Sequence, residues 1–219
     1  MIRAILWDND GVLVDTERLY FEATRSVLAE NGAELTVPIY KEFLLKRSEG
    51  AWHLATDAGV SEREIPRLRS ERDRRYSELL SQESLVMDHA AETLRRLCPH
   101  FKMGVVTSSR REHFDIIHRT SGLLPFFDFI LTREDYANSK PDPEPYLLAL
   151  QHTAAAKAEC LAIEDAERGL RAAKAAGLSC WVVPTILTSD GDFATADRVL
   201  THIAEVADLL LGPKLHSDA

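Results

Sequence analysis

The sequence has few cysteines and no long apolar run. Only three of its 219 residues are cysteine, Cys98, Cys160 and Cys180, and no two of them form a close pair. This spacing does not predict a disulfide framework, so we expect buried, reduced thiols of a cytoplasmic protein. The apolar segments are too short for a secretion signal or a transmembrane helix, so we expect no membrane association.

The chain also lacks an excess of basic residues. Its formal net charge is -9 at pH 7, from 26 Lys and Arg against 35 Asp and Glu. This charge argues against nucleic acid or an anionic membrane as the main partner. With 45% hydrophobic and 28% charged residues, the composition is that of a globular protein that needs no structural metal. We expect a monomer, with a dimer as the alternative.

A short apolar stretch near the N-terminus leads into two carboxylates. Residues 2–7 are almost entirely apolar, as in a strand buried on both faces of a parallel sheet, and Asp8 and Asp10 follow. Ligands bind at the carboxyl ends of such strands. Alternate residues of an extended strand point to the same side. Repulsion between the two carboxylates must therefore be relieved by a cation or by protonation of one of them.

The next part of the chain has a helical pattern. Apolar residues recur at three- and four-residue spacing from Leu19 to Leu28, and further helices are predicted over residues 38–45, 49–58 and 61–81. Ser61 and Glu64 have the spacing of a capping box. The last helix carries six arginines interleaved with acids, which we interpret as a solvated face rather than an anion site. They are Arg63, Arg67, Arg69, Arg72, Arg74 and Arg75.

Strands and helices alternate in the remainder of the chain. The predicted strands cover residues 101–107, 129–132, 161–163, 180–183 and 198–200, and the predicted helices cover 90–97, 112–120, 166–176 and 203–211. This alternation predicts an α/β fold, with a parallel sheet and helices on both of its faces. We expect residues 1–16 and 84–219 to form this core, with residues 17–83 inserted as a helical domain.

Polar residues follow four of the predicted strands. In a parallel sheet these strand ends share one edge, so the residues should meet. Carboxylate oxygens are the ligands that Mg²⁺ prefers, and the hydroxyl and ammonium donors suit a phosphoryl group. The four segments are Asp8 to Asp10, Thr107-Ser108-Ser109, Ser139-Lys140-Pro141 and Glu164-Asp165.

Each segment has a simpler interpretation when it is taken alone. Asp8 to Gly11 is a good turn sequence, and Thr107 to Ser109 is typical of a turn or helix cap. Their combination at successive strand ends favours a site. We expect Thr16 to cap the first inserted helix and Asp15 to orient the site. His113 and His118 lie on one helix without ligand spacing, so we interpret them as structural or surface groups.

The four segments resemble, in their usual order, the four motifs of the haloacid dehalogenase superfamily. The resemblance covers the whole chain and implies a Rossmann-like core. The helical insertion directly after the first motif resembles the α-helical, C1-type cap of the branch with phosphoglycolate phosphatases, sugar-phosphate phosphatases and β-phosphoglucomutases. The residues that carry it are Asp8-Asn9-Asp10-Gly11-Val12-Leu13-Val14-Asp15-Thr16, Val105-Val106-Thr107-Ser108-Ser109, Ser139-Lys140-Pro141-Asp142-Pro143 and Ile163-Glu164-Asp165.

The resemblance implies a Mg²⁺-dependent phosphatase that acts on a small phosphorylated metabolite. Asp8 would attack phosphorus, and Asp10 would act as general acid and then base. The metal ligands would be Asp8, the backbone carbonyl of Asp10, Asp165 and Glu164, the last directly or through water. The phosphoryl oxygens would be held by Thr107, Lys140 and the backbone N–H groups of Asn9, Asp10 and Ser108.

Two alternatives remain open. A β-phosphoglucomutase would carry a histidine and an arginine where this chain has Tyr20 and Glu49, and Lys46 replaces the usual glycine of the cap loop, so hydrolysis is preferred. Arg47, in that loop, is a candidate substrate contact. A signalling receiver module also has an acidic pair, a phosphorylated Asp and a Lys around Mg²⁺. Receivers are shorter and have no helical insertion, so an enzyme is preferred.

Overall fold

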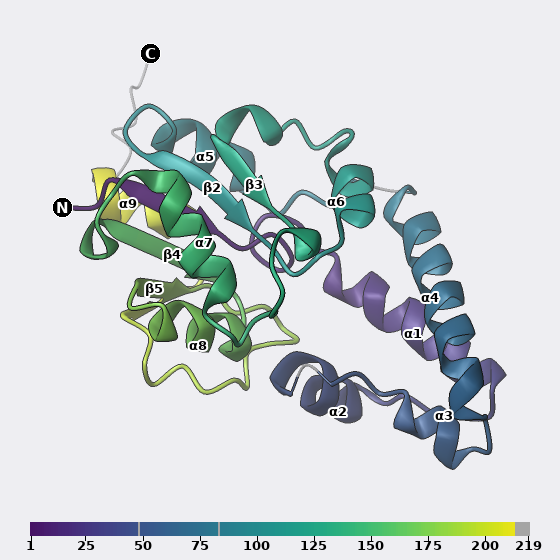
Figure 1. Cartoon of the computed structure of the whole chain (residues 1–219). Helices are drawn as coiled ribbons and strands as arrows, with labels where there is room; N and C mark the ends of the chain where they lie inside the picture. Colours follow the sequence, from purple (N-terminus) through teal and green to yellow (C-terminus); the bar gives the residue numbers. More distant parts are fainter. Residues whose placement is uncertain (48, 83, 213–219) are drawn as a thin grey trace.

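A parallel sheet of six strands forms the centre of the protein (Figure 1). The computed structural model describes residues 1–47, 49–82 and 84–212. The strands follow the order β3-β2-β1-β4-β5-β6, and every pairing is parallel. They are β1 (Ala4–Trp7), β2 (Lys102–Val106), β3 (Phe129–Leu131), β4 (Cys160–Glu164), β5 (Ser179–Val182) and β6 (Arg198–Val199). The predicted α/β fold is confirmed.

Strand β1 is central because it can be buried on both faces. Its four residues are at most 1% exposed, and they pair with β2 on one side and β4 on the other. Leu6 lies opposite Gly104 of β2 and Ala162 of β4. Since all three strands run in the same direction, the segments after Trp7, Val106 and Glu164 leave the sheet at the same edge.

Alternate residues of β1 enter two different hydrophobic clusters. Ile5 and Trp7 contribute to the cluster that includes residues of α5 (Ala90–Leu97), α6 (Arg111–His118) and α9 (Ala204–Leu211). Ala4 and Leu6 contribute to the cluster that includes residues of α7 (Glu144–Thr153) and α8 (Glu167–Ala175). The period of two along the strand therefore produces helices on both faces of the sheet, as the sequence predicts.

The chain between β1 and β2 is helical and has a hydrophobic cluster of its own. We call residues 17–80 the inserted helices; Figure 1 shows them to one side of the sheet. Ser61 and Glu64 form the predicted capping box. The helices are α1 (Glu17–Glu30), α2 (Val37–Tyr40), a π-helical turn (Lys41–Lys46), α3 (His53–Asp57), a 3₁₀ turn (Glu62–Glu64) and α4 (Ile65–Leu80).

Ion pairs join the inserted helices to the sheet-containing part at two places. The Lys41 ammonium lies 2.9 Å from an Asp190 carboxylate oxygen, and the Arg110 guanidinium lies 2.9 Å from a carboxylate oxygen of Asp73 in α4. Leu187 also packs against the hydrophobic cluster of the inserted helices. The inserted helices and the sheet-containing part are therefore in direct contact at two separate places.

The structure contains one helix that the sequence did not predict, and it contradicts one predicted burial. Helix α7 was not predicted, because prolines at positions 141, 143 and 145 are typical of a loop, but Pro145 lies in the first turn of α7, where its missing N–H costs no hydrogen bond. Cys98 is exposed, whereas Cys160 and Cys180 are buried thiols as expected.

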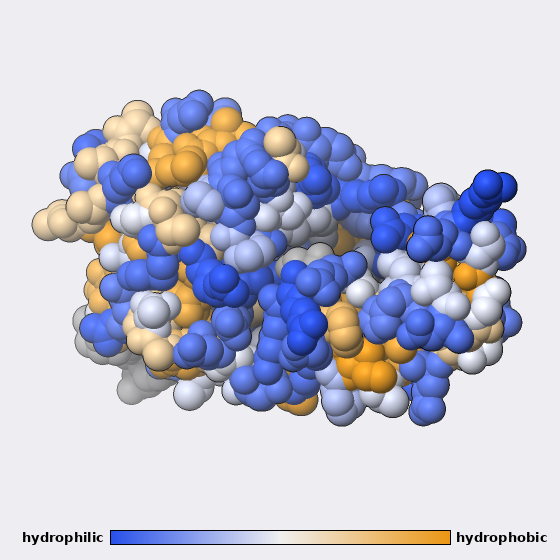
Figure 2. Space-filling model, turned by 60° about the horizontal axis from the view of Figure 1, so that its bottom comes forward, coloured by the Kyte–Doolittle hydropathy of each residue, from blue (hydrophilic) through white to orange (hydrophobic). Residues whose placement is uncertain are grey.

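No helix among the described residues is long and apolar enough to span a bilayer. Figure 2 shows a mostly hydrophilic face with separate, small hydrophobic patches.

The central position of β1 predicts the effect of a truncation there. Ile5→Ala should lower the free energy of unfolding by about 3 kcal/mol, because it leaves a cavity in a fully buried cluster. Chemical denaturation followed by circular dichroism measures this change. The matched control is Ile186→Ala, since Ile186 is 91% exposed, and its effect should stay within about 0.5 kcal/mol. Equal effects of the two substitutions would contradict the described core.

Candidate active site

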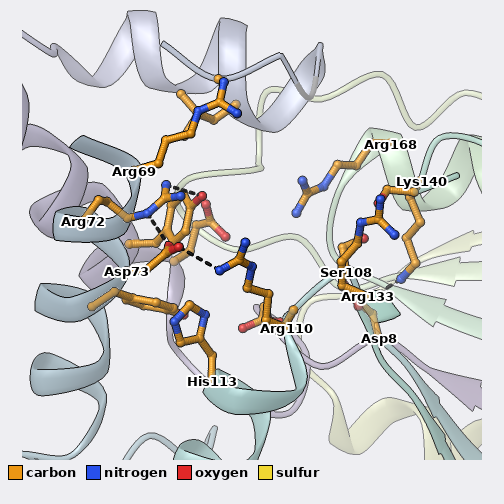
Figure 3. A pocket seen from close by; sticks show the side chains of 18 residues that line it. Asp8, Arg69, Arg72, Asp73, Ser108, Arg110, His113, Arg133, Lys140 and Arg168 are labelled. Carbon is orange, nitrogen blue, oxygen red and sulfur yellow. Dashed lines mark hydrogen bonds and ion pairs between the residues drawn. The ribbon is translucent and has the colours of Figure 1, made fainter. Parts of the chain in front are cut away.

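The segments after β1, β2 and β4 meet the loop before α7 and the inserted helices around one pocket (Figure 3). Its volume is about 440 Å³. The predicted residues Asp8, Asp10, Ser108 and Lys140 all line it. The sequence-based expectation that these side chains meet at one edge of the sheet therefore agrees with the structure.

The buried side chain of Lys140 binds the carboxylate of Asp8. Its ammonium donates hydrogen bonds to Asp8 Oδ1 at 2.9 Å and to the Val106 carbonyl at 2.8 Å, and it lies 2.7 Å from Glu164 Oε1. The Lys140 side chain is almost fully buried, so these three oxygens replace water around its charge. Burial disfavours the charged form of Lys140 and lowers its pKa. The charges of Asp8 and Glu164 have the larger, opposite effect, so the pKa of Lys140 is raised.

Asp8 lies in an environment that disfavours its charge. Burial is the largest cause, and the nearby carboxylate of Glu164 adds to it, so the pKa of Asp8 is raised to about 7. Lys140 acts in the opposite direction but does not cancel these two effects. In the metal-free protein Asp8 is thus half-protonated near neutral pH, which is one of the two forms of relief that the sequence predicts.

Asp8, Glu164 and Asp165 form a buried cluster of carboxylates. One oxygen from each lies within 4.8 Å of the others. Burial, followed by the charges of Asp8 and Glu164, raises the pKa of Asp165 well above its usual value. Three acidic groups with one ammonium between them leave an excess of negative charge, and their hard oxygen ligands suit a divalent cation such as Mg²⁺. The residues present therefore fit the expected metal.

Two glycines allow these carboxylates to lie so close to the backbone. A Cβ atom at Gly11 would overlap Asp165 Oδ2, and a Cβ atom at Gly169 would overlap Glu164 Oε2. Gly11 also has a φ of +82°, which other residues rarely adopt. The Tyr146 hydroxyl donates a hydrogen bond to Glu164 from helix α7. Tyr146 was not identified from the sequence, because it belongs to α7, the helix that was not predicted.

The Asp10 carboxylate accepts hydrogen bonds from three hydroxyl groups. Thr16 donates to Oδ1 at 2.5 Å, while Thr107 and Ser109 donate to Oδ2 at 3.0 and 2.7 Å. The Thr16 hydroxyl makes no helix-capping hydrogen bond, so its predicted role as a cap is wrong. Asp15 pairs with Arg18 at the surface, 3.2 Å away. Thr16, rather than Asp15, therefore orients Asp10.

The remaining polar groups around the nucleophile position are largely buried. Ser108 Oγ makes no hydrogen bond within the described residues, so its hydroxyl is available to a ligand. The Asn9 side chain is fully buried, and its Oδ1 lies 2.8 Å from His118 Nε2. Burial lowers the pKa of His118 to about 4, so this histidine is neutral and structural, as expected. His113 is also buried, with its ring against Tyr76.

The arginines of the inserted helices differ in part from their predicted role. Arg72 is 8% exposed; its guanidinium lies over the rings of Tyr20 and Trp52 and donates a hydrogen bond to Asp73 at 2.8 Å. The interpretation of a wholly solvated helix is wrong there, because the aromatic rings supply the surface that water would otherwise cover. Arg69 and Arg72 both line the pocket.

Two further arginines differ from the prediction: Arg47 was predicted to contact the substrate but lies outside the pocket, whereas Arg168 was not predicted but lines it. Arg47 is exposed, pairs with Glu42 at 2.6 Å and lies over the Phe43 ring, and it does not line the pocket. Arg168, in the first turn of α8, does line it, as does Glu17. Neither was singled out from the sequence. Glu17 directly follows the first motif and Arg168 lies three residues after the fourth, and this closeness is the signal that could have identified them.

Comparison with known proteins agrees with the geometry. The family model of haloacid dehalogenase-like hydrolases matches residues 5–183. The chain is 32% identical to a phosphorylated carbohydrates phosphatase of Thermotoga maritima, over 81% of this chain and 82% of that protein. It is 30% identical to a validoxylamine A 7'-phosphate phosphatase of Streptomyces hygroscopicus subsp. limoneus, over 97% and 100%.

A solved structure of similar fold binds a phosphorylated sugar. It is a mutant of CbbY from Rhodobacter sphaeroides in complex with xylulose-(1,5)bisphosphate, with 27% identity, a TM-score of 0.79, and coverage of 94% of this chain and 96% of that chain. The order of the motifs, the sheet topology and these matches agree with one another. The chain therefore belongs to the haloacid dehalogenase-like hydrolases, as a phosphoric monoester hydrolase.

Proposed function

We propose that this protein is a Mg²⁺-dependent phosphatase that hydrolyses a small phosphorylated metabolite through an aspartyl-phosphate on Asp8. The substrate class is a sugar phosphate, a phosphoglycolate-like compound or a related phosphomonoester, in line with the names of the relatives. The observation that carries the proposal is the position of Asp8, which lines the pocket while Lys140, Glu164 and Asp165 surround its carboxylate.

Asp8 would supply the nucleophilic oxygen. Lys140 holds Oδ1, so the carboxylate has a fixed orientation with respect to the pocket. Attack on phosphorus forms the Asp8 Oδ–P bond and breaks the bond from phosphorus to the ester oxygen of the substrate. Thr107, Lys140, the hydroxyl of Ser108 and the backbone N–H groups of Asn9, Asp10 and Ser108 would hold the phosphoryl oxygens, at positions fixed before the substrate arrives.

Asp10 would transfer the protons. Protonated Asp10 would give its proton to the departing alkoxide, and the resulting carboxylate would take a proton from the water that hydrolyses the aspartyl-phosphate. The hydroxyls of Thr16, Thr107 and Ser109 hold this carboxyl group in place. Asp8 and Asp10 can therefore have different tasks although they are two residues apart, since they have different neighbours.

Asp8, Asp165 and the Asp10 backbone carbonyl would hold Mg²⁺, with Glu164 as a direct or water-mediated ligand. When bound, the metal reduces the repulsion between the nucleophile and the phosphoryl oxygens. Among the described residues, the cluster of Asp8, Glu164 and Asp165 is the group of buried acids close enough together for this purpose. Lys140 reduces its excess negative charge but does not neutralise it.

The inserted helices would act as a cap over the catalytic core. We assign residues 17–83 to the cap and residues 1–16 and 84–219 to the core, because Glu17, Tyr20, Arg69 and Arg72 line the same pocket as Asp8. Hydrolysis is preferred over a mutase reaction because Tyr20 and Glu49 occupy the positions that would discriminate the two. The acidic net charge and the two buried thiols support a cytoplasmic enzyme without a nucleic-acid or membrane partner.

Replacement of either catalytic carboxylate should abolish turnover without unfolding the chain. Hydrolysis of p-nitrophenyl phosphate in the presence of Mg²⁺ measures the effect. Asp8→Asn removes the nucleophile and should lower kcat by at least about a thousandfold, and Asp10→Asn should lower it by about a hundred- to ten-thousandfold.

The matched control for these two substitutions is Asp15→Asn. Asp15 lies in the same segment but pairs with Arg18 at the surface, so this variant should keep wild-type activity. Full activity of Asp8→Asn or Asp10→Asn, or activity that persists after Mg²⁺ is removed with EDTA, would contradict the proposal.

The raised pKa of Asp8 predicts how stability depends on pH in the metal-free protein. Folding raises this pKa from 3.8 to about 7, so the folded state binds more protons than the unfolded state within that window. The stabilising contribution is complete below pH 4 and is lost as the pH rises through 7. In EDTA, the Tm of Asp8→Asn relative to wild type should therefore increase from pH 4 to pH 7.

Mg²⁺ should reverse this loss. It needs the ionised carboxylate, so it should raise the Tm of wild type more at pH 7.5 than at pH 5. Differential scanning calorimetry of both proteins, with EDTA and with Mg²⁺, tests both expectations. A Tm difference between Asp8→Asn and wild type that does not change with pH would show that Asp8 does not titrate in this window.

A further inference from the structure

The pocket is rich in positive charge although the whole chain has a net charge of -9. Its lining includes more cationic than acidic side chains. A cleft with this charge attracts anions locally, whatever the sign of the whole protein. The cationic residues are Arg69, Arg72, Arg110, Arg133, Arg168 and Lys140, and the acidic residues are Asp8, Asp10, Glu17 and Asp73.

Most of these cations already have a partner in the protein. Arg72 and Arg110 donate hydrogen bonds to the same carboxylate, Asp73, at 2.8 and 2.9 Å. Arg133 donates to the Tyr136 carbonyl at 2.8 Å, and Lys140 is bound to Asp8. These four groups are positioned by the protein itself and do not need a ligand to satisfy them.

Arg168 differs from them. It is half-buried in the first turn of α8, and it makes no hydrogen bond or ion pair with any described residue. The charges of Glu17, Asp8 and Asp165 raise its pKa, so it remains a cation. A half-buried guanidinium without a direct hydrogen-bond partner has lost part of its hydration, and its N–H groups could donate to an anionic ligand in the pocket. Figure 3 shows the Arg168 side chain directed into the pocket.

Arg69 faces the same space from the inserted helices. It lies on α4, has no hydrogen bond or ion pair within residues 1–47, 49–82 and 84–212, and lines the pocket. In Figure 3 it is seen across the pocket from Asp8 and Lys140. The phosphoryl group that reacts with Asp8 already has Lys140, Ser108 and backbone N–H groups around it. It does not account for a second set of guanidinium groups.

We propose that Arg168 and Arg69 bind a second anionic group of the substrate. The substrate would then be a small phosphomonoester that also carries another phosphate or a carboxylate, since planar guanidinium groups bind either anion through paired hydrogen bonds. This inference rests on the proposed phosphatase function, because it assigns the reacting phosphate to Asp8 and the second anion to the arginines.

Three probes that differ only at one end test the inference. They are 1,5-pentanediol bisphosphate, 5-phosphooxypentanoate and 5-hydroxypentyl phosphate, compared by kcat/KM for phosphate release with Mg²⁺. Wild type should prefer one or both of the probes with two anionic groups over the hydroxyl probe by about tenfold or more. A preference for the bisphosphate identifies a phosphate as the second group, and a preference for the carboxylate probe identifies a carboxylate.

Arg168→Met and Arg69→Met should each reduce that preference by about tenfold. The matched controls are Arg171→Met on the same helix as Arg168 and Arg67→Met on the same helix as Arg69, since both are exposed and neither lines the pocket. The controls should keep the wild-type preference. Equal hydrolysis of all three probes by wild type, or an Arg168→Met variant that loses activity on all three in the same proportion, would overturn the inference.

Binding without turnover separates this inference from the proposed function. Isothermal titration calorimetry of Asp8→Asn with each probe measures affinity when hydrolysis is blocked. Tighter binding of a probe with two anionic groups, lost in the Asp8→Asn, Arg168→Met double variant, supports the second anion site. This result would hold even if wild type hydrolysed none of the probes. Absence of hydrolysis would count against the phosphatase proposal only. Equal affinity for all three probes overturns the second anion site alone.

Discussion

The structure depends on a buried group of charges that is not neutral. Asp8, Glu164 and Asp165 cluster at the carboxyl ends of β1 and β4, and the ammonium of Lys140 pairs with Asp8 and Glu164. Burial would make such a group unstable if the carboxylates were fully ionised, so the pKa values of Asp8 and Asp165 rise. The same imbalance makes the group suitable for a divalent cation. The features that disfavour the metal-free, ionised state are thus those that a metal-dependent enzyme needs.

Neighbouring side chains give the two motif aspartates different properties. Asp8 is held by an ammonium and lies among carboxylates, whereas Asp10 is held by three hydroxyl groups from two separate loops. One environment suits a nucleophile beside a metal, and the other suits a group that gives and takes protons. Because Thr16 directly precedes α1, its hydrogen bond to Asp10 connects the site to the inserted helices, which contribute to the lining of the pocket.

Local patterns in the sequence predicted the sheet and the motif residues, because these depend on short-range signals. The apolar run of β1 and the capping box at Ser61 are examples. Roles that depend on distant neighbours were not predictable in this way. Arg72 is buried because Tyr20 and Trp52 lie against it, and Thr16 binds Asp10 instead of capping a helix. Arg168 follows the fourth motif closely in the sequence, but its charge interaction with Glu17 and Asp8 joins distant parts of the chain and so was not predicted.

The central claim is that the phosphoryl group of the substrate is transferred to the Asp8 carboxylate before it is released to water. Rapid-quench mass spectrometry during turnover of p-nitrophenyl phosphate tests it most directly, by searching for a covalent phosphoryl adduct on the peptide that contains Asp8. The account predicts a transient adduct on Asp8 in wild type that decays as phosphate is released, and no adduct in Asp8→Asn. Turnover with no adduct at any time, together with a single-turnover burst that excludes rapid decay, would contradict it, as would an adduct on another residue.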